Sequence, residues 1–465
     1  MTPRYGQLAY TSFDAPGTAG GFDAPGTAGG WQVKQTRGRL AANEVRALVS
    51  GVQTVFQPPQ PPPAYPTPEQ LARLPRRLAY RRLDGLDGEA AAYWHSVPAG
   101  ADATGRPGNV FAHVLLDRAA VEPRPGHRPI QLWRSPGWLC PYGKAAVAAA
   151  QLPADPPGPA PVVTRDSVID FALGGATWRL GVLCGLLDAV AAALDGGPPV
   201  LLGVGSVDAG AQWIGFLMSP GTARALSFST FERAEQLGPA LRAGQQLTAI
   251  PREDLARTPG GVVVIDEAEE LSLGELGGQP HRTAAGQLIE VTAWSAMAQV
   301  ALLDVASARL LLSDIDAFAA QVPDVGLHPA WPMAMSALTR GEFADAAAEA
   351  RSVVATNAPR DADPESPAAR TVRDVVAAAV GASTADAWAA VQRMPGGPAG
   401  DLAAAVYLRR AVSDATWLGQ LGPVPLAGGV FAGRAVPAEV GRWLGRRWPR
   451  RAPTARTGWC GWWIC

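Results

Sequence analysis

An acidic pair at the end of an apolar run is the pattern in this sequence that comes nearest to catalytic chemistry. Asp266 and Glu267 follow the β-branched run Val262-Val-Val-Ile265, and runs of this kind form buried parallel strands. In nucleotide hydrolases an acidic residue at such a strand end holds Mg²⁺. Phosphate binding also needs a glycine-rich loop that ends in Lys and Ser or Thr, and no such loop precedes the run. A degenerate NTPase that uses Asp266 and Glu267 is therefore an alternative interpretation.

A pair of glycines lies upstream of this run. Gly203 and Gly205 precede a stretch with helical periodicity, an arrangement similar to the first part of a dinucleotide-binding fingerprint. Asp208 stands where the third glycine of that fingerprint belongs. We therefore expect no bound cofactor here, and we predict that Asp208 caps the helix.

A histidine followed by a hydroxyl and a thiol suggests a second kind of chemistry. His113 lies in the apolar run Asn109–Leu116, and Ser135 and Cys140 come after it. A serine or cysteine nucleophile requires a base within hydrogen-bond reach, so a hydrolase built on His113 with Cys140 or Ser135 is a second alternative. The sequence has no nucleophile-elbow motif, and a single histidine in a strand is more often a core residue. The histidines and cysteines lack metal-ligand spacing, so we expect no metal site.

Composition limits the class of protein. The chain has 465 residues, of which 48% are hydrophobic, and its formal net charge is −1. This length suggests roughly three domains, and the near-zero charge argues against a nucleic-acid partner. No apolar run reaches the ~20 residues that a membrane span needs, and the first residues lack a secretory pattern. The four cysteines do not form a disulfide framework. We expect a cytoplasmic protein without a membrane span.

Changes in residue pattern along the chain predict a multidomain protein of mixed α+β and α/β class. We expect a mixed-strand N-terminal domain, a middle α/β domain with a mainly parallel sheet, and a helical C-terminal region. The predicted ranges are 1–151 for the N-terminal α+β domain, 162–282 for the middle α/β domain, 283–440 for the helical region and 441–465 for an irregular tail. The tail has the Arg, Trp and Cys bias of a truncated or frame-shifted product.

Hydrophobic periodicity predicts the elements that would position these residues. Short apolar or alternating runs indicate strands, at 109–116, 129–133, 200–204, 225–231, 247–250 and 261–266. Helical spacing indicates helices at 178–194, at 209–218 and from residue 284 onward, with Ser313 and Asp316 as an N-terminal cap. Alternation of strands and helices in the middle region favours a parallel sheet with crossover connections.

Three segments have unusual composition. The nine residues 13–21 are repeated without change at 22–30, which we interpret as a lengthened surface loop. The proline stretch 57–68 indicates a stiff spacer. The basic run 73–82 is interpreted as a solvated face.

Three groups of short motifs are informative when they are taken in order. They are Gln7–Phe13 with Gly30–Lys34, Gly105–His113 with Leu132–Pro136, and Trp213 with Ala225–Phe231. Together they resemble the GTPase-associated protein 1 family of actinobacteria and other bacteria, in its type 2 N-terminal domain and its middle domain. The candidate site residues that lie in these motifs are Asn109, His113, Trp133, Ser135, Ser227 and Thr230.

The resemblance implies a non-catalytic accessory or adaptor protein of a bacterial GTPase-centred system of the conflict or defence type. Its partners would be a GTPase and other proteins of the same gene neighbourhood, and the family supplies no established active site. Our main hypothesis is therefore an adaptor that acts by protein–protein interaction, without a cofactor. The degenerate NTPase and the hydrolase remain the alternatives.

Overall fold

The structure is a computed structural model that describes most of the chain up to residue 413. The described residues are 3–13, 30–58, 66–83, 86, 90–102, 105–119, 127–174, 178–215, 218–302, 304–321, 328–340, 346–358, 366–394 and 397–413. Most of the repeat, the centre of the proline stretch and the predicted tail lie outside them. Residues 1–313 and 314–465 form two compact units, each of which is described by itself. The finer predicted domain boundaries remain predictions.

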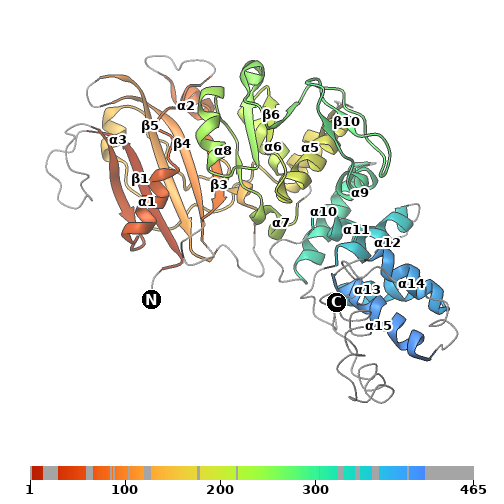
Figure 1. The fold of residues 1–465 in the computed structure, drawn as a ribbon. Coiled ribbons are helices and arrows are strands. Elements are labelled where there is room, and N and C mark those ends of the chain that lie inside the picture. The colour runs from red at the N-terminus through yellow and green to blue at the C-terminus, as the bar shows by residue number, and fades with distance from the viewer. Residues whose placement is uncertain are drawn as a thin grey trace, which may run out of the picture. The chain divides into compact units, whose positions relative to one another are not determined.

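A nine-stranded sheet forms the centre of the first unit (Figure 1). Its strands are β1 (Tyr5–Ser12), β2 (Trp31–Arg37), β3 (Arg77–Arg82), β4 (Ala91–Ala101), β5 (Pro107–Asp117), β6 (Val200–Val204), β7 (Phe228–Ser229), β8 (Leu247–Pro251) and β9 (Val263–Asp266). Their order across the sheet is β2-β1-β5-β4-β3-β7-β8-β6-β9. Pairs from β2 to β7 are antiparallel, and pairs from β7 to β9 are parallel. The predicted mixed N-terminal part and mainly parallel middle part are confirmed, and both belong to one sheet.

Each face of the antiparallel half carries an apolar core, because side chains alternate between the two faces of a strand. Helix α1 (Ala42–Ser50) covers one face, where its Leu48 packs with Leu8 and Trp94. The indole Nε1 of Trp94 donates a hydrogen bond of 2.8 Å to the carbonyl oxygen of Leu48. Phe111 belongs to the core of the opposite face and packs with Val147 of α3 (Lys144–Ala149). A further helix, α2 (Pro68–Arg73), precedes β3.

Helices and 3₁₀ turns connect the strands of the parallel half. They are α4 (Arg165–Leu173), α5 (Trp178–Leu194), α6 (Val207–Ile214), α7 (Pro220–Ala225), α8 (Leu237–Arg242), η2 (Ala234–Gln236) and η3 (Arg252–Arg257). Helix α6 approaches β8 closely at Gly210, where an added Cβ would lie 2.9 Å from the Cβ of Ala249. A two-stranded hairpin, β10 (His281–Arg282) and β11 (Leu288–Ile289), follows β9.

Most elements predicted for this unit have the expected type. The helix at 178–194 and the strand at 200–204 have the predicted bounds. The strand predicted at 129–133 is wrong, because Pro129–Leu132 forms the 3₁₀ helix η1, in which the side chain of Gln131 accepts a bond from the amide of Arg128. The stretch 225–231 contains only the end of α7 and the short strand β7.

The basic run is a second departure from prediction. Its residues 77–82 form β3, which lies inside the sheet between β4 and β7. Arg77 is buried, and its Nε lies 2.8 Å from Oε1 of Glu232. Tyr80 is also buried, and its hydroxyl donates a bond of 3.0 Å to the carbonyl oxygen of Arg224. The solvated-face interpretation is wrong for this part of the run, because the acid that neutralises Arg77 comes from a distant segment.

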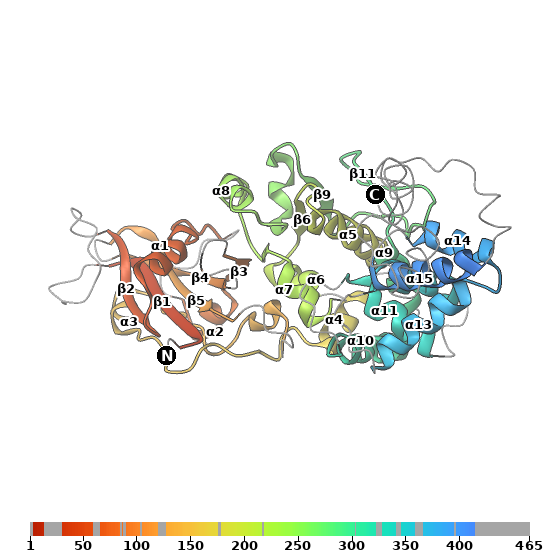
Figure 2. The same ribbon diagram turned by 60° about the horizontal axis from the view of Figure 1, so that its bottom comes forward.

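Helices make up the described part of the second unit (Figure 2). They are α11 (Ala330–Thr339), α12 (Ala347–Thr356), α13 (Pro367–Ala379), α14 (Thr384–Arg393) and α15 (Gly397–Ser413). Each of these helices packs against the next one along the chain. Buried alanines, such as Ala350, Ala387 and Ala403, allow the helix axes to approach closely. The predicted helical C-terminal region is confirmed.

Two helices lie near the division between the units. Helix α9 (Ala293–Ala301) belongs to the first unit, and α10 (Val305–Ala319) spans the division. The cap predicted at Ser313 and Asp316 is wrong, because both residues lie inside α10. Asp304 stands before this helix, and its Oδ1 accepts bonds of 2.7 and 2.9 Å from the first amides of the helix.

Candidate functional site

Asp266 ends strand β9, as the sequence predicts, but its carboxylate is already paired. Arg252, at the start of η3, donates two hydrogen bonds to it, of 2.7 Å to Oδ1 and 2.9 Å to Oδ2. The amide of Ala268 donates a third, of 3.0 Å, to Oδ1. A bidentate arginine satisfies both oxygens of a carboxylate. A magnesium ion would have to displace Arg252 before it could bind Asp266.

Glu267 binds the glycine loop itself. Its Oε1 accepts a hydrogen bond of 2.5 Å from the amide of Gly205, and its Oε2 accepts one of 3.0 Å from the indole of Trp213. Gly205 lies just before α6, and the start of a helix is where a nucleotide site would bind phosphate. An internal carboxylate takes that position in this protein. The structure thus brings the acidic pair and the glycine loop together, in an arrangement that joins β9 to α6.

His113 is a fully buried residue of β5 with both ring nitrogens in hydrogen bonds. Its Nδ1 accepts a bond of 3.2 Å from the amide of Leu139, so its Nε2 carries the proton and donates to Oε1 of Gln7 at 3.0 Å. Trp138 lies edge-on against the ring, with 5.0 Å between ring centroids. Burial lowers the pKa of His113 to about 3. The imidazole is therefore neutral, and its acceptor nitrogen is engaged.

The other candidates of the hydrolase alternative bond to nearby backbone. Ser135 accepts a bond of 3.3 Å from the amide of Gly137, and the thiol of Cys140 donates to the carbonyl oxygen of Trp138 at 3.7 Å. Asn109 holds the end of β1, since its Nδ2 donates a bond of 3.1 Å to the carbonyl oxygen of Ser12. The first two contacts are local to the segment after η1, and the third holds β1 against β5.

Trp133 joins the segment after η1 to the parallel half of the sheet. Its buried indole donates a bond of 3.1 Å to Oδ1 of Asp208. Arg134 donates to the same carboxylate, with bonds of 2.8 and 3.2 Å. The cap of α6 is Ser206, whose hydroxyl accepts from the amide of Ala209 at 3.1 Å. The prediction that Asp208 caps the helix is therefore wrong.

Ser227 and Thr230 flank strand β7. The hydroxyl of Thr230 accepts a bond of 2.9 Å from the amide of Leu78, and the amide of Thr230 donates one of 3.0 Å to the carbonyl oxygen of Leu78. The hydroxyl of Ser227 donates a bond of 2.7 Å to the carbonyl oxygen of Gly244. Both hydroxyls are used to fix β7, the strand between the antiparallel and the parallel parts of the sheet.

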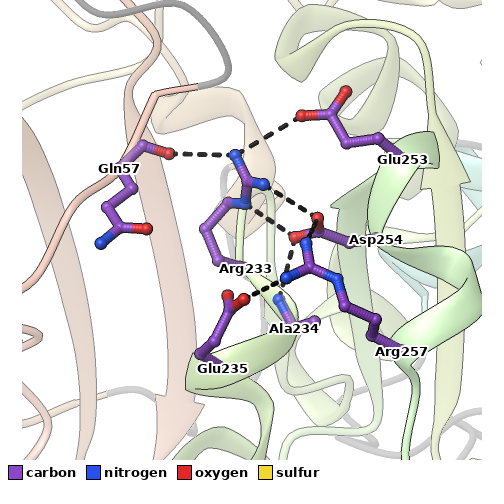
Figure 3. Close-up of polar contacts among 7 residues, drawn as sticks. All are labelled: Gln57, Arg233, Ala234, Glu235, Glu253, Asp254 and Arg257. Atoms are coloured by element: carbon purple, nitrogen blue, oxygen red, sulfur yellow. Dashed lines mark hydrogen bonds and ion pairs between the residues drawn. The ribbon is translucent and has the colours of Figure 1, made fainter.

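An ionic cluster lies where β7 and β8 end (Figure 3). Asp254 is buried and accepts two bonds from Arg233, of 2.7 and 2.9 Å. Arg257 pairs with Asp254 and with Glu235. Burial by itself raises the pKa of Asp254, but bonds from Arg233, from the amide of Ala234 and from Arg257 outweigh it, so this pKa lies below its usual value. The cluster pairs two arginines with acids of both 3₁₀ helices and so links η2 to η3.

Sequence patterns missed a buried pair formed by Asp188 and His281. Oδ2 of Asp188 lies 2.8 Å from Nε2 of His281, and both side chains are fully buried. Nδ1 of His281 lies 2.9 Å from the carbonyl oxygen of Ser272 and 3.4 Å from its hydroxyl. A proton on Nδ1 bonds to the carbonyl, so this nitrogen cannot act as a base for the serine. The sequence signal was the lone acidic residue within the apolar helix α5.

The helical unit contains a groove of about 390 Å³ between α12, α13 and the end of α14. Its buried lining residues are Ala355, Val375 and Met394. Two exposed cations, Arg351 and Arg393, stand on its α12 and α14 sides. No histidine, cysteine, aspartate or glutamate is among the described residues that line it. The groove is therefore a candidate binding surface.

No group of three or more His, Cys, Asp and Glu side chains in the described ranges could hold a metal ion. Among the helices of the same ranges, none combines the length and the apolar character required to cross a bilayer.

Family models match two parts of the chain. Residues 4–157 match the model of "GTPase-associated protein 1, N-terminal domain type 2". Residues 312–450 match the model of "SaeB, TPR-like domain", a range that includes helices α11 to α15. Two of the three motif groups that carry the predicted resemblance lie within residues 4–157.

Curated relatives match almost the whole chain. The protein named "Putative ESX-1 scaffolding and assembly protein SaeB" from Mycolicibacterium smegmatis strain ATCC 700084 / mc(2)155 is 58% identical over 459 residues, which are 97% of this chain and 54% of the relative. The protein of the same name from strain MKD8 is 58% identical over 445 residues, 95% of this chain and 52% of the relative. No solved structure matches. The chain spans about half the length of these relatives. The resemblance to the GTPase-associated protein 1 family is confirmed for residues 4–157, within a chain that is similar along nearly its whole length to SaeB proteins.

Proposed function

We propose that this chain is a non-catalytic scaffold that holds other proteins in an assembly. The observation that carries the proposal is the helical unit with its groove between α12, α13 and α14, a surface that can receive a partner and that lacks catalytic groups among its described lining residues. The name of the relatives supports it, because that name describes scaffolding and assembly for ESX-1. On this support we propose that the assembly is of the ESX-1 kind.

The candidate chemical groups already form hydrogen bonds and ion pairs within the protein, which supports the same proposal. Asp266 is paired with Arg252, Glu267 binds the amide of Gly205, and both nitrogens of His113 are engaged. A nucleotide or an acyl substrate would have to break these bonds before it could reach the groups. We propose that the motif residues serve the fold and not a reaction; they are Asn109, His113, Trp133, Ser135, Ser227 and Thr230.

A GTPase as one of the partners is the second candidate. The match of residues 4–157 to a GTPase-associated domain favours it. In this version the chain is an adaptor in a GTPase-centred system of the conflict type, located in the cytoplasm. A GTPase encoded in the same gene neighbourhood should then bind the chain with an affinity that differs between the GTP-loaded and GDP-loaded forms. Equal binding of both forms, or no binding of either, would contradict the GTPase adaptor but not the general scaffold.

Calorimetry separates the scaffold from the NTPase alternative. The purified full chain is titrated with GTP and with ATP in the presence of Mg²⁺, and turnover is measured by phosphate release. We expect no saturable heat and no turnover, because Arg252 and Gly205 already occupy the acidic pair. Saturable binding with turnover that disappears in Asp266→Asn would contradict the non-catalytic part of the proposal.

Chemical crosslinking in the cells that encode the chain tests the scaffold itself. The crosslinked proteins are identified by mass spectrometry, produced separately and titrated against the purified chain. A scaffold should bind at least two different proteins directly. Direct binding of none of them would overturn the proposal.

A further inference from the structure

We propose that the groove between α12, α13 and α14 binds an extended acidic peptide segment whose carboxylates lie on either side of a small aliphatic side chain. This inference rests on the proposed scaffold function and names the kind of partner that the groove takes. It is argued from the charge, the floor and the walls of the groove.

The charge of the groove has one sign. Arg351 lies on α12 and Arg393 at the end of α14, and both side chains are exposed. Arg393 uses its Nε for a bond of 3.3 Å to the carbonyl oxygen of Ala389, and the two terminal nitrogens of its guanidinium are not part of that bond. Arg351 makes no hydrogen bond or ion pair with another described residue. The described lining has no acidic side chain that would compete for these arginines, so an acidic ligand complements the charge of the groove.

Arginine selects the chemistry of that ligand. A guanidinium presents its donors in a planar fork that matches the two oxygens of a carboxylate. Two such forks on different helices fit two acidic side chains of one segment better than a single small anion. A partner segment with acidic residues on both sides of the groove therefore fits the observed charges.

The floor and walls of the groove determine what lies between the carboxylates. Ala355, Val375 and Met394 are buried and apolar, so they offer a place for an aliphatic side chain. The walls carry only methyl groups at Ala348 and Ala378, which lets a backbone approach closely. The volume of about 390 Å³ lies at the small end of the range of about 300–1,000 Å³ for ligand pockets. The groove therefore accommodates a few side chains of a longer segment.

Hydroxyl groups on α12 suit an extended backbone. Ser352 and Thr356 line the groove one helical turn apart. The hydroxyl of Thr356 donates to the carbonyl oxygen of Ser352, so its oxygen remains able to accept a bond from a peptide amide. An extended peptide presents such amides, whereas a helical partner has used them internally. This favours an extended occupant.

The test uses the full chain and a random-peptide phage library as the probe. Enriched peptides are synthesised with a fluorescein label, and their affinity is measured by fluorescence polarisation. We expect enriched peptides to carry Asp or Glu on both sides of an aliphatic residue and to bind more weakly as salt is raised. Enrichment of basic or uncharged peptides, or no enrichment, would overturn the proposal.

Matched variants show whether the peptides occupy this groove. Ala378→Trp fills it, whereas Ala377→Trp places the same bulk on an exposed neighbour outside the lining. Arg351→Glu reverses a charge of the groove, whereas Arg370→Glu reverses an exposed charge of α13 outside it. We expect binding to weaken on the order of tenfold or more, equivalent to about 1.4 kcal/mol, in the first member of each pair only. Circular dichroism and thermal unfolding of each variant verify that it folds.

The remaining outcomes are also decisive. Equal peptide binding in Ala378→Trp and Ala377→Trp would overturn the assignment to this groove. Self-association of the chain that disappears in Ala378→Trp would show that a second copy is the occupant, which also contradicts the proposal. If peptides bind as expected but no partner protein is assembled, the scaffold function fails while the groove stands. If partners assemble equally on wild type and Ala378→Trp and no peptide binds, the proposed peptide site is wrong and the scaffold function is still supported.

Discussion

The carboxylate of Glu267 interacts with the start of α6, the amide of Gly205 and the indole of Trp213. Each of these favours a negative charge or needs a hydrogen-bond acceptor. The carboxylate lies at the start of α6, where the helix dipole is positive, and it binds the amide of Gly205. Trp213 is buried, and its indole N–H depends on the same carboxylate for a partner. A buried donor without an acceptor is costly. Glu267 is therefore a stabilising contact between the end of β9 and α6.

Removal of this carboxylate should therefore destabilise the first unit. We expect Glu267→Ala to lower the free energy of unfolding by about 1–3 kcal/mol, because the indole of Trp213 and the amide of Gly205 lose their acceptor. Urea titration followed by fluorescence measures the loss. Glu270→Ala, at an exposed acid three residues along, should change stability by less than about 0.5 kcal/mol. Equal effects of the two variants would contradict the assigned role of Glu267.

Two neutral histidines lie next to each other in the antiparallel half of the sheet. His95 of β4 pairs in register with His113 of β5, and both are fully buried. Burial holds the pKa of His95 well below its usual value, and the nearby positive charges of Arg76 and Arg134 lower it further. Burial also lowers the pKa of His113 to about 3. Both imidazoles are therefore neutral in the folded protein near neutral pH.

This arrangement predicts a dependence of stability on pH. An unfolded histidine gains a proton below about pH 6.5, whereas folded His113 does so only near pH 3. The contribution of neutral His113 to the free energy of unfolding is therefore fully present above about pH 6.5. It falls by about 1.4 kcal/mol per pH unit as the pH decreases towards about 3. Urea titrations between about pH 7.5 and pH 5 should show a shallower fall for His113→Gln than for wild type. An unchanged slope in the variant would show that His113 is not buried in its neutral form.

At the scale of elements, β3 is the strand that connects the four other strands of the antiparallel half to β7. It pairs with β4 on one side and with β7 on the other, so it joins the antiparallel and parallel parts of the sheet. Arg77 lies on this strand with Glu232 as its buried partner. Loss of one member of a buried ion pair leaves the other charge without compensation.

Arg77→Ala should accordingly be one of the most destabilising substitutions at a buried position of this strand. We expect a loss of about 3–5 kcal/mol in the free energy of unfolding, measured by urea titration or as a lower thermal midpoint. Arg82→Ala, at the exposed end of the same strand, provides the matched control, with a change below about 0.5 kcal/mol. The double variant Arg77→Met with Glu232→Met should regain part of the loss, because neither charge is then left alone in the core. A single variant that is as stable as wild type would contradict the buried pair.

Local patterns predicted elements well where burial follows from the element's own residues. Helix α5 and strand β6 are apolar throughout, so their periodicity and length were sufficient. Sequence patterns did not predict the role of a side chain whose bonding partner lies in a distant segment. The basic run could not be recognised as β3, because Glu232 lies 155 residues from Arg77. The hydrogen bonds of the acidic pair could not be predicted for the same reason. Gly205, which donates to Glu267, lies 62 residues from it.

At the scale of the whole molecule, the chain contains a sheet unit whose candidate chemical groups form hydrogen bonds within that unit, and a helical unit whose groove has two exposed arginines. The two family matches fall on these two units, at residues 4–157 and 312–450. Motif order along the sequence was enough to predict the first match. The groove could not be predicted, because its lining comes from three helices whose packing is a tertiary property.

A scaffold differs from a protein that merely binds several others in turn, because it holds different partners at the same time. Sedimentation velocity of the full chain mixed with two of its crosslinked partners measures this directly. The account predicts one complex whose mass is the sum of all three proteins, formed without nucleotide. Two separate binary complexes that never combine, with each partner displacing the other, would contradict it.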